Sequence, residues 1–180
     1  RKGEDTVVAV IGDGFRAGQD LRLVNPRHGP LPEMTDEPQK VDALAADLLD
    51  EWRKHRDDVY LDADGHPDPV RGSLFLVFSN EGVPSPDWNL YDELRELLVK
   101  GGMPRKTIRF IHETGSDRRK KSELMAACND GHVAVLIGST EKMGVGTNFQ
   151  RRVAGIYKMH PHWRPDYDEQ EDARGRRPGP

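Results

Sequence analysis

The sequence has little cysteine and no long apolar run, and each absence excludes a class of protein. Its single cysteine, Cys128, cannot build a disulfide framework, which favours a reducing, cytoplasmic environment and a small buried side chain. No apolar stretch approaches the roughly 18 residues of a membrane span, and no signal peptide opens the chain, so we expect no membrane partner. The chain starts at Arg1 rather than Met, which favours a fragment of a longer protein.

The chain also lacks a complete catalytic set. It contains no G-x-x-x-x-G-K-[ST] phosphate loop and no G-x-S-x-G nucleophile elbow. His160 and His162 have no further ligand at metal-binding spacing, and the loop with Asp62, Asp64 and Asp68 lacks the closing glutamate of a calcium loop. We therefore expect no metal site.

Charge is unevenly distributed along the chain. The net charge is −4, with charged residues at 32% and apolar residues at 35% of 180, enough for one core with exposed loops. Residues 31–68 hold 12 acidic and 4 basic side chains, whereas residues 103–158 hold 11 basic and 5 acidic. The second half can therefore meet a polyanion. The basic run at 118–121 either adds to such a surface or is a solvated helix start.

The N-terminal part shows one apolar run and one amphipathic stripe. Thr6–Ile11 predicts a strand, and Gly12, Gly14 and Gly18 follow it as GxGxxxG. This pattern leaves open a nucleotide-cofactor enzyme built on Gly12–Gly18, although a tight turn at Asp13-Gly14 is simpler, since a loop follows instead of a second strand. A helix is predicted over 37–57, capped by Thr35 or Asp36, with one apolar stripe of Val41, Leu44, Ala45, Leu48, Leu49 and Trp52. Residues 60–72 predict a loop or small hairpin.

From Ser73 onward, strands and helices alternate. Predicted strands lie at 74–78, 107–111, 132–137 and 153–157, and predicted helices begin at Asp87 and at Ser116 or Asp117. Strands separated by helices imply right-handed crossovers and a mostly parallel sheet, that is, an α/β fold.

Residues 132–150 are the stretch around which the rest is organised. An apolar strand runs into a polar loop broken by Gly144 and Gly146, with hydrogen-bonding side chains at Thr140, Lys142 and Asn148. Ligands of open α/β sheets bind just past the carboxyl ends of strands, where this loop lies. A plain strand-to-helix connection remains the alternative.

The C-terminal segment carries a second candidate. Gln170, Arg174 and Arg177 are spaced by four and three, so a helix would place them on one face. Arginine presents planar donors suited to phosphate, and two arginines one turn apart suit a γ-phosphate clamp. A frayed, charged tail is the alternative.

These motifs resemble those of a known family. Residues 73–180 look like the second RecA-like domain of superfamily-2 helicases, a P-loop NTPase-type fold, in the Swi/Snf-type translocase branch. LFLVFSN (74–80) resembles motif IV, VLIGSTEKMGVGTNFQ (135–150) resembles motif V, and HPHWRPDYDEQEDARGRR (160–177) resembles the Trp-Arg-Pro segment and motif VI. Ala173 replaces the glycine usual in motif VI. The resemblance is specific because two ordered motifs agree at the right separation.

The resemblance implies a division of labour between two domains. ATP and Mg²⁺ would lie between this domain and an N-terminal RecA-like domain of the same parent chain, which holds the phosphate loop. The family roles fall on Arg174 and Arg177 as catalytic fingers, on Gly144, Gly146, Asn148 and Gln170 as ATP-binding residues, and on Ser79, Asn80, Thr140 and Lys142 as DNA-backbone contacts.

The same resemblance sets the expected domain organisation and activity. Residues 1–72 form an N-terminal extension on the motor domain, and DLRLVNP (20–26) is similar to the linker of bacterial and phage helicase–methylase, anti-restriction-type proteins. The chain is expected to be part of an ATP hydrolase that is inactive alone. The alternative is a degenerate RecA-like module that binds nucleic acid or protein without motor activity.

Overall fold

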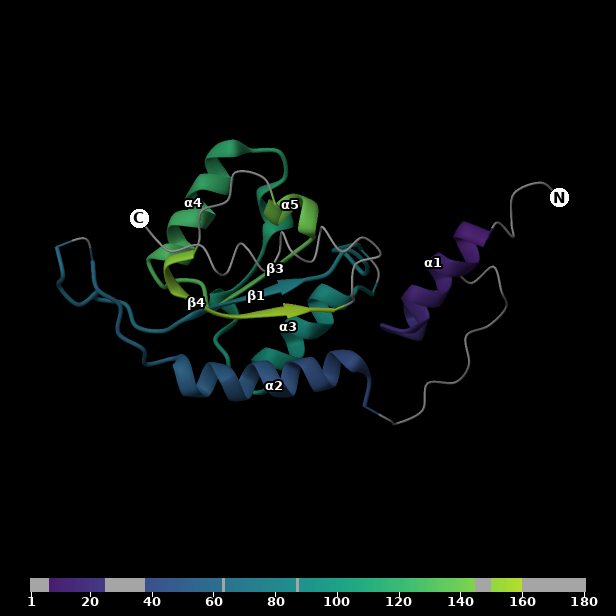
Figure 1. The fold of residues 1–180 in the computed structure, drawn as a ribbon, viewed down its shortest axis with the longest axis horizontal. Coiled ribbons are helices and arrows are strands. Elements are labelled where there is room, and N and C mark those ends of the chain that lie inside the picture. The colour runs from purple at the N-terminus through teal and green to yellow at the C-terminus, as the bar shows by residue number, and fades with distance from the viewer. Residues whose placement is uncertain (1–6, 25–37, 63, 87, 145–149, 160–180) are drawn as a thin grey trace.

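The computed structural model describes residues 7–24, 38–62, 64–86, 88–144 and 150–159 (Figure 1). The α-helices are α1 (Val7–Ala17), α2 (Lys40–His55), α3 (Leu90–Lys100), α4 (Arg118–Asn129) and α5 (Thr140–Gly144). The strands are β1 (Leu74–Phe78), β2 (Ile108–Phe110), β3 (Val135–Gly138) and β4 (Val153–Lys158). Short 3-10 turns lie at Leu21–Leu23, Arg105–Thr107, Ile111–Thr114 and Gln150–Arg152. None of the described helices has the length and apolarity needed to cross a membrane.

The four strands form one parallel sheet in the order β2-β3-β1-β4. β1 lies inside the sheet, and all five of its residues are buried. A strand covered on both faces reads as a continuous apolar run, as LFLVF does. The predicted α/β class with a parallel sheet is confirmed, and this arrangement is consistent with a RecA-like fold.

Two apolar layers cover the sheet, one on each face. Alternate β1 side chains divide between them, because successive residues of a strand point to opposite faces. Phe75 and Val77 belong to the cluster with α2 and α3, while Leu76 and Phe78 belong to the cluster with α4. Figure 1 shows α2 and α3 on one side of the sheet and α4 and α5 on the other. Cys128 of α4 is fully buried in the second cluster, and burial raises the pKa of its thiol to about 12.

The predicted amphipathic helix is confirmed as α2. Its buried residues are Val41, Ala45, Leu48 and Leu49, which pack in the same core as α3. Gln39 caps it, and the backbone N–H of Gln39 donates to the Asp42 carboxylate at 2.7 Å. Thr35 and Asp36, the predicted caps, lie outside the described residues, as does Asp87, whereas Asn89 caps α3 and Asp117 caps α4. The predicted hairpin at 60–72 is present, closed by an antiparallel bridge between Leu61 and Pro67.

The strand predicted at Thr6–Ile11 is wrong, because Val7–Ala17 is helical. The apolar run continues past the glycines to Phe15, and Arg16 pairs with Asp13 within the helix and with Glu81 across the fold. β-branched residues prefer strands only weakly, and such tertiary ties override that preference. Gly12 and Gly14 therefore lie inside a helix, not at the strand-to-helix turn that a dinucleotide fingerprint requires.

A buried arginine holds the hairpin against the amino ends of the strands. Arg152 is fully buried, and its guanidinium donates to the carbonyl oxygens of Asn129 (2.7 Å) and Val70 (2.9 Å) and to the Asp68 carboxylate (2.5 Å). A Cβ on Gly131 would lie 2.3 Å from this guanidinium, so glycine is required there. Buried charge is tolerated only when paired and hydrogen-bonded, as here.

Replacing Arg152 by alanine should destabilise the fold by about 3–5 kcal/mol, since Asp68 loses one of its two arginine partners and three carbonyl oxygens, including that of Gly72, lose their buried donor. Urea unfolding of the 180-residue chain measures the change. Arg119→Ala is the matched control; this side chain is 87% exposed, and its removal should cost less than about 0.5 kcal/mol. Similar unfolding midpoints for the two variants would contradict the role assigned to Arg152.

Candidate functional site

The carboxyl ends of β1 and β3 meet at one edge of the sheet. The strands are parallel neighbours, with Phe78 opposite Gly138, so the residues after each strand lie side by side. The Thr140 N–H donates to Asn80 Oδ1 at 2.9 Å, and Asn80 Nδ2 donates to Thr140 Oγ1 at 3.2 Å. The structure thus brings together two of the predicted contacts from segments 60 residues apart.

Three of the four predicted DNA contacts have side chains engaged within the protein. Ser79 is buried, and its hydroxyl donates to the Glu81 carbonyl oxygen at 2.8 Å. Thr140 is also buried, and Asn80 is half-buried against it. Lys142 is exposed on α5. Within this set Lys142 presents charge to solvent, and the other three fix the geometry of the edge.

A basic surface extends from α5 onto the start of α4. We call this surface the basic edge and define it as Arg118, Arg119, Lys120, Lys121 and Lys142. Lys121 Nζ donates to the Lys142 carbonyl oxygen at 3.1 Å, which joins the two helices. Arg119 pairs with Glu123 at 2.9 Å. Both side chains are exposed to solvent, so salt screens the attraction between them. The start of α4 and the short α5, on one face of the sheet, thus bring positive charge together.

His112 follows β2 and lies at the same edge of the sheet. From the sequence alone, it could equally be a packed or a solvated histidine. Its ring packs edge-on against Tyr91 at 5.3 Å between centroids. Its Nδ1 atom is buried without a hydrogen-bond partner among the described residues. Burial lowers the pKa of His112, and the positive charge of Lys142 lowers it further. The imidazole is therefore neutral at pH 7.

The polar loop predicted after β3 begins as a helix instead. Residues Thr140–Gly144 form α5, since the Met143 N–H donates to the Ser139 carbonyl oxygen at 2.9 Å and Met143 is fully buried. An apolar anchor in a polar stretch is the signal that favours a short helix here. Gly144 ends α5. Gly146, Asn148, Gln170, Arg174 and Arg177 lie outside the described residues, as do His160 and His162.

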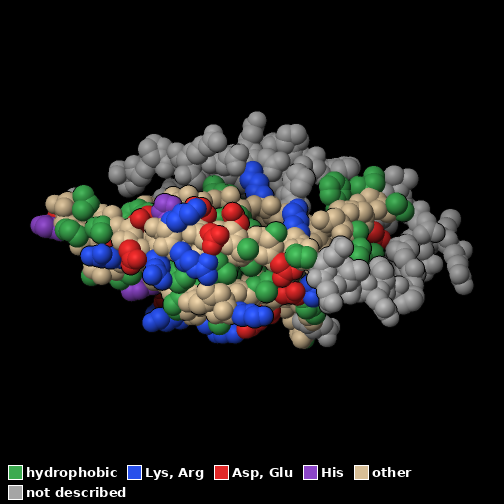
Figure 2. Space-filling view, turned by 90° about the horizontal axis from the view of Figure 1, so that it is seen from below, with side chains coloured by type: hydrophobic (Ala, Val, Ile, Leu, Met, Phe, Trp, Pro, Cys, Tyr) green, Lys and Arg blue, Asp and Glu red, His purple; other side chains and the backbone are tan. Residues whose placement is uncertain are grey.

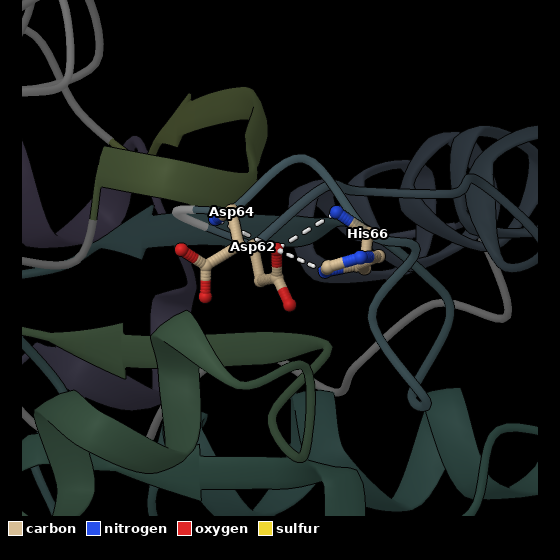
Figure 3. Close-up of side chains that lie close together, drawn as sticks. All are labelled: Asp62, Asp64 and His66. Atoms are coloured by element: carbon tan, nitrogen blue, oxygen red, sulfur yellow. Dashed lines mark hydrogen bonds and ion pairs between the residues drawn. The ribbon is translucent and has the colours of Figure 1, made fainter.

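A small carboxylate and imidazole group lies on the hairpin (Figure 3). The ligand atoms of Asp62, Asp64 and His66 lie within 4.8 Å of one another. Asp62 Oδ1 accepts hydrogen bonds from the backbone N–H groups of Asp64 (2.9 Å) and His66 (2.8 Å), an arrangement that fixes the turn. Asp68 faces away from this group to pair with Arg151 and Arg152. These hydrogen bonds within the turn account for the closeness of the three side chains.

Comparison with known proteins assigns no family. No protein-family model matches the chain, and no curated protein matches it either. Any function given to the carboxyl edge therefore depends on the residues and geometry described above.

The lowered pKa of His112 predicts a pH-dependent stability. Protonation of His112 is harder in the folded chain than in the unfolded chain, so the unfolded state binds more protons as pH falls through about 6.5. The free energy of unfolding should therefore decrease as the pH is lowered from about 7.5 to about 5.5. Part of that decrease should be absent in His112→Gln. Urea midpoints across this range measure both chains, with the exposed His132→Gln as control. Identical pH profiles for wild type and His112→Gln would contradict the assignment.

Proposed function

We propose that this chain is the C-terminal RecA-like motor domain of an ATP-dependent DNA helicase or translocase. The observation that carries the proposal is the joined carboxyl edge, where the residues after β1 and β3 hydrogen-bond to one another beside exposed Lys142. These are the segments that resemble motifs IV and V. Carboxyl ends of parallel strands are the usual ligand-binding edge of such sheets.

ATP would bind between this domain and an N-terminal RecA-like domain in the same, cytoplasmic, parent chain. The sequence contains no phosphate loop, so the partner domain would hold most of the triphosphate and its Mg²⁺. Arg174 and Arg177 would stabilise the charge on the γ-phosphate in the transition state, with Gln170 nearby. Gly144, Gly146 and Asn148 would shape this side of the cleft. The isolated chain is then half of an active site.

DNA would contact the basic edge through its phosphates. Lysine and arginine neutralise phosphates without reading bases, so binding is independent of sequence and weakens with salt. Lys142 lies two residues before Gly144, where the segment assigned to the ATP cleft begins. A shift of that segment on ATP binding would move Lys142 through the short, anchored α5. This is a direct mechanical link between the nucleotide and the grip on DNA.

A second candidate is a binding module without motor activity. It is favoured by Ala173, which stands where the resembled motif has glycine. It is also favoured by the side chains of Ser79 and Thr140, because each is engaged within the protein, with Glu81 and Asn80 respectively. Such a module would bind nucleic acid through the basic edge, or a protein partner, but would not respond to ATP. ATPase assays separate the two candidates.

The motor proposal predicts negligible ATPase activity for the isolated chain and DNA-stimulated activity for the full-length parent. In the parent, Arg174→Ala and Arg177→Ala should each lower kcat at least about a thousandfold, because an arginine finger contributes that much to phosphoryl transfer. The affinity of both variants for DNA should stay within about twofold of wild type. Arg105→Ala is the control, because it removes an exposed arginine paired with Glu96, and its kcat and DNA affinity should both stay within about twofold of wild type. Full turnover in both finger variants would exclude the assignment.

Removing Lys142 should weaken binding to duplex DNA equally for all sequences. One phosphate contact fewer lowers the slope of log affinity against log salt by about one. Fluorescence anisotropy at several salt concentrations compares Lys142→Ala with Lys40→Ala, which removes an exposed lysine from α2 on the other face of the sheet. An unchanged salt slope in Lys142→Ala, or the same loss in Lys40→Ala, would place DNA elsewhere.

A further inference from the structure

A cavity lies at the amino edge of the sheet, opposite the carboxyl edge described above. It has a volume of about 330 Å³ and is lined by the end of α2 and by residues that precede β1, β2 and β3, among them Trp52, Arg56, Arg71, Gly72, Thr107 and Ala134. This volume is at the lower end of the range of about 300–1,000 Å³ typical of small-molecule sites. Figure 2, the view from below, shows Lys and Arg side chains interspersed with Asp and Glu on that side of the molecule.

Planar groups form one wall of the cavity. Trp52 and Arg56 are one helical turn apart at the end of α2, and the Arg56 guanidinium lies 5.6 Å from the centre of the Trp52 ring. Both side chains line the cavity, and Arg56 is exposed. Bases stack on aromatic rings and on arginine planes alike, irrespective of their sequence.

Positive charge dominates the cavity mouth. Arg71 is exposed and forms no ion pair within the described part of the chain. Arg56 has one acidic neighbour, Asp57, at 3.5 Å, and this pair is exposed. Lys106, next to the lining residue Thr107, is also exposed. Arginine is the side chain best suited to bind a phosphate through two parallel hydrogen bonds.

Gly72 sets how closely the loop before β1 passes the end of α2. Gly72 has a φ of +105°, and a Cβ there would lie 3.0 Å from the Arg56 carbonyl oxygen. Any other residue would be strained and would press against the end of α2. Gly72 thus allows the loop that carries Arg71 to approach the helix that carries Trp52 and Arg56.

We propose that this cavity binds a nucleotide unit, with its base stacked on the Trp52–Arg56 pair and its phosphate held by Arg71. A planar wall next to an arginine at the mouth matches the base and phosphate of one nucleotide. The unit comes either from a free mononucleotide or from single-stranded nucleic acid. The site goes beyond the proposed motor function, because it lies at the opposite edge from the basic edge and uses none of its residues.

Calorimetric titration of the 180-residue chain tests the site with four probes: dAMP, deoxyadenosine, inorganic phosphate and a single-stranded oligo(dA). We expect dAMP to bind more tightly than deoxyadenosine or phosphate alone, since it uses both halves of the site. Arg71→Ser should weaken dAMP binding about tenfold, the usual effect of losing a charged hydrogen bond, and leave deoxyadenosine binding unchanged. Arg56→Ser should weaken both.

Lys40→Ser is the control, because it removes an exposed lysine from the start of α2, at the other end of that helix from the cavity, and should leave dAMP binding unchanged. Arg71-dependent binding that is much tighter for oligo(dA) than for dAMP supports a nucleic-acid strand as the source, and equal affinities support a free nucleotide. The proposal is overturned if dAMP does not bind at millimolar concentration, or if phosphate binds as tightly as dAMP. It is also overturned if Arg71→Ser and Lys40→Ser weaken binding equally. None of these outcomes depends on ATPase activity.

Discussion

The parallel pairing of β1 with β3 is the constraint on which the rest of the structure depends. Phe75 to Phe78 lie opposite Val135 to Gly138, and both strands are buried on both faces. Burial fixes the register, because a slip by one residue would exchange the side chains of the two apolar layers. A fixed register places Asn80 beside Thr140, and it places the amino ends of the same strands at the opposite edge. The functional groups at each edge therefore come from the loops that begin or end at these two strands.

The two edges differ in how they are stabilised and in what they present. At the carboxyl edge, neutral polar groups satisfy one another, and Lys142 presents charge to solvent. At the amino edge, Arg152 is sealed inside and holds the hairpin through carbonyl oxygens and Asp68. That buried anchor leaves Arg71, on the same hairpin's return to β1, facing the cavity. One arginine thus serves the fold, and another remains available to a ligand.

The sequence predicts those features that depend on local pattern, and it misses those that depend on distant contacts. β1 was predicted to the residue because five consecutive apolar residues have few alternatives. The existence of α2 was predicted because its stripe repeats over several turns, although the helix runs over Lys40–His55 and not over 37–57. The run at Thr6–Ile11 has the composition of a strand, yet it is helical and tied to the fold by Arg16 and Glu81, 65 residues apart. Strand ends at Asn80 and Thr140 could be predicted to meet, but not the burial of Ser79 and Thr140. The cavity at the amino edge could not be predicted, since its walls come from four separate segments of the chain.

The central claim is that the carboxyl edge is a shared element of a nucleotide cleft and a DNA grip. Hydrogen–deuterium exchange on the full-length parent tests it most directly, with and without a non-hydrolysable ATP analogue and duplex DNA. The account predicts slower amide exchange at residues 79–81 and 138–144 when both ligands are present. Unchanged exchange at the carboxyl edge in the fully liganded parent would contradict it.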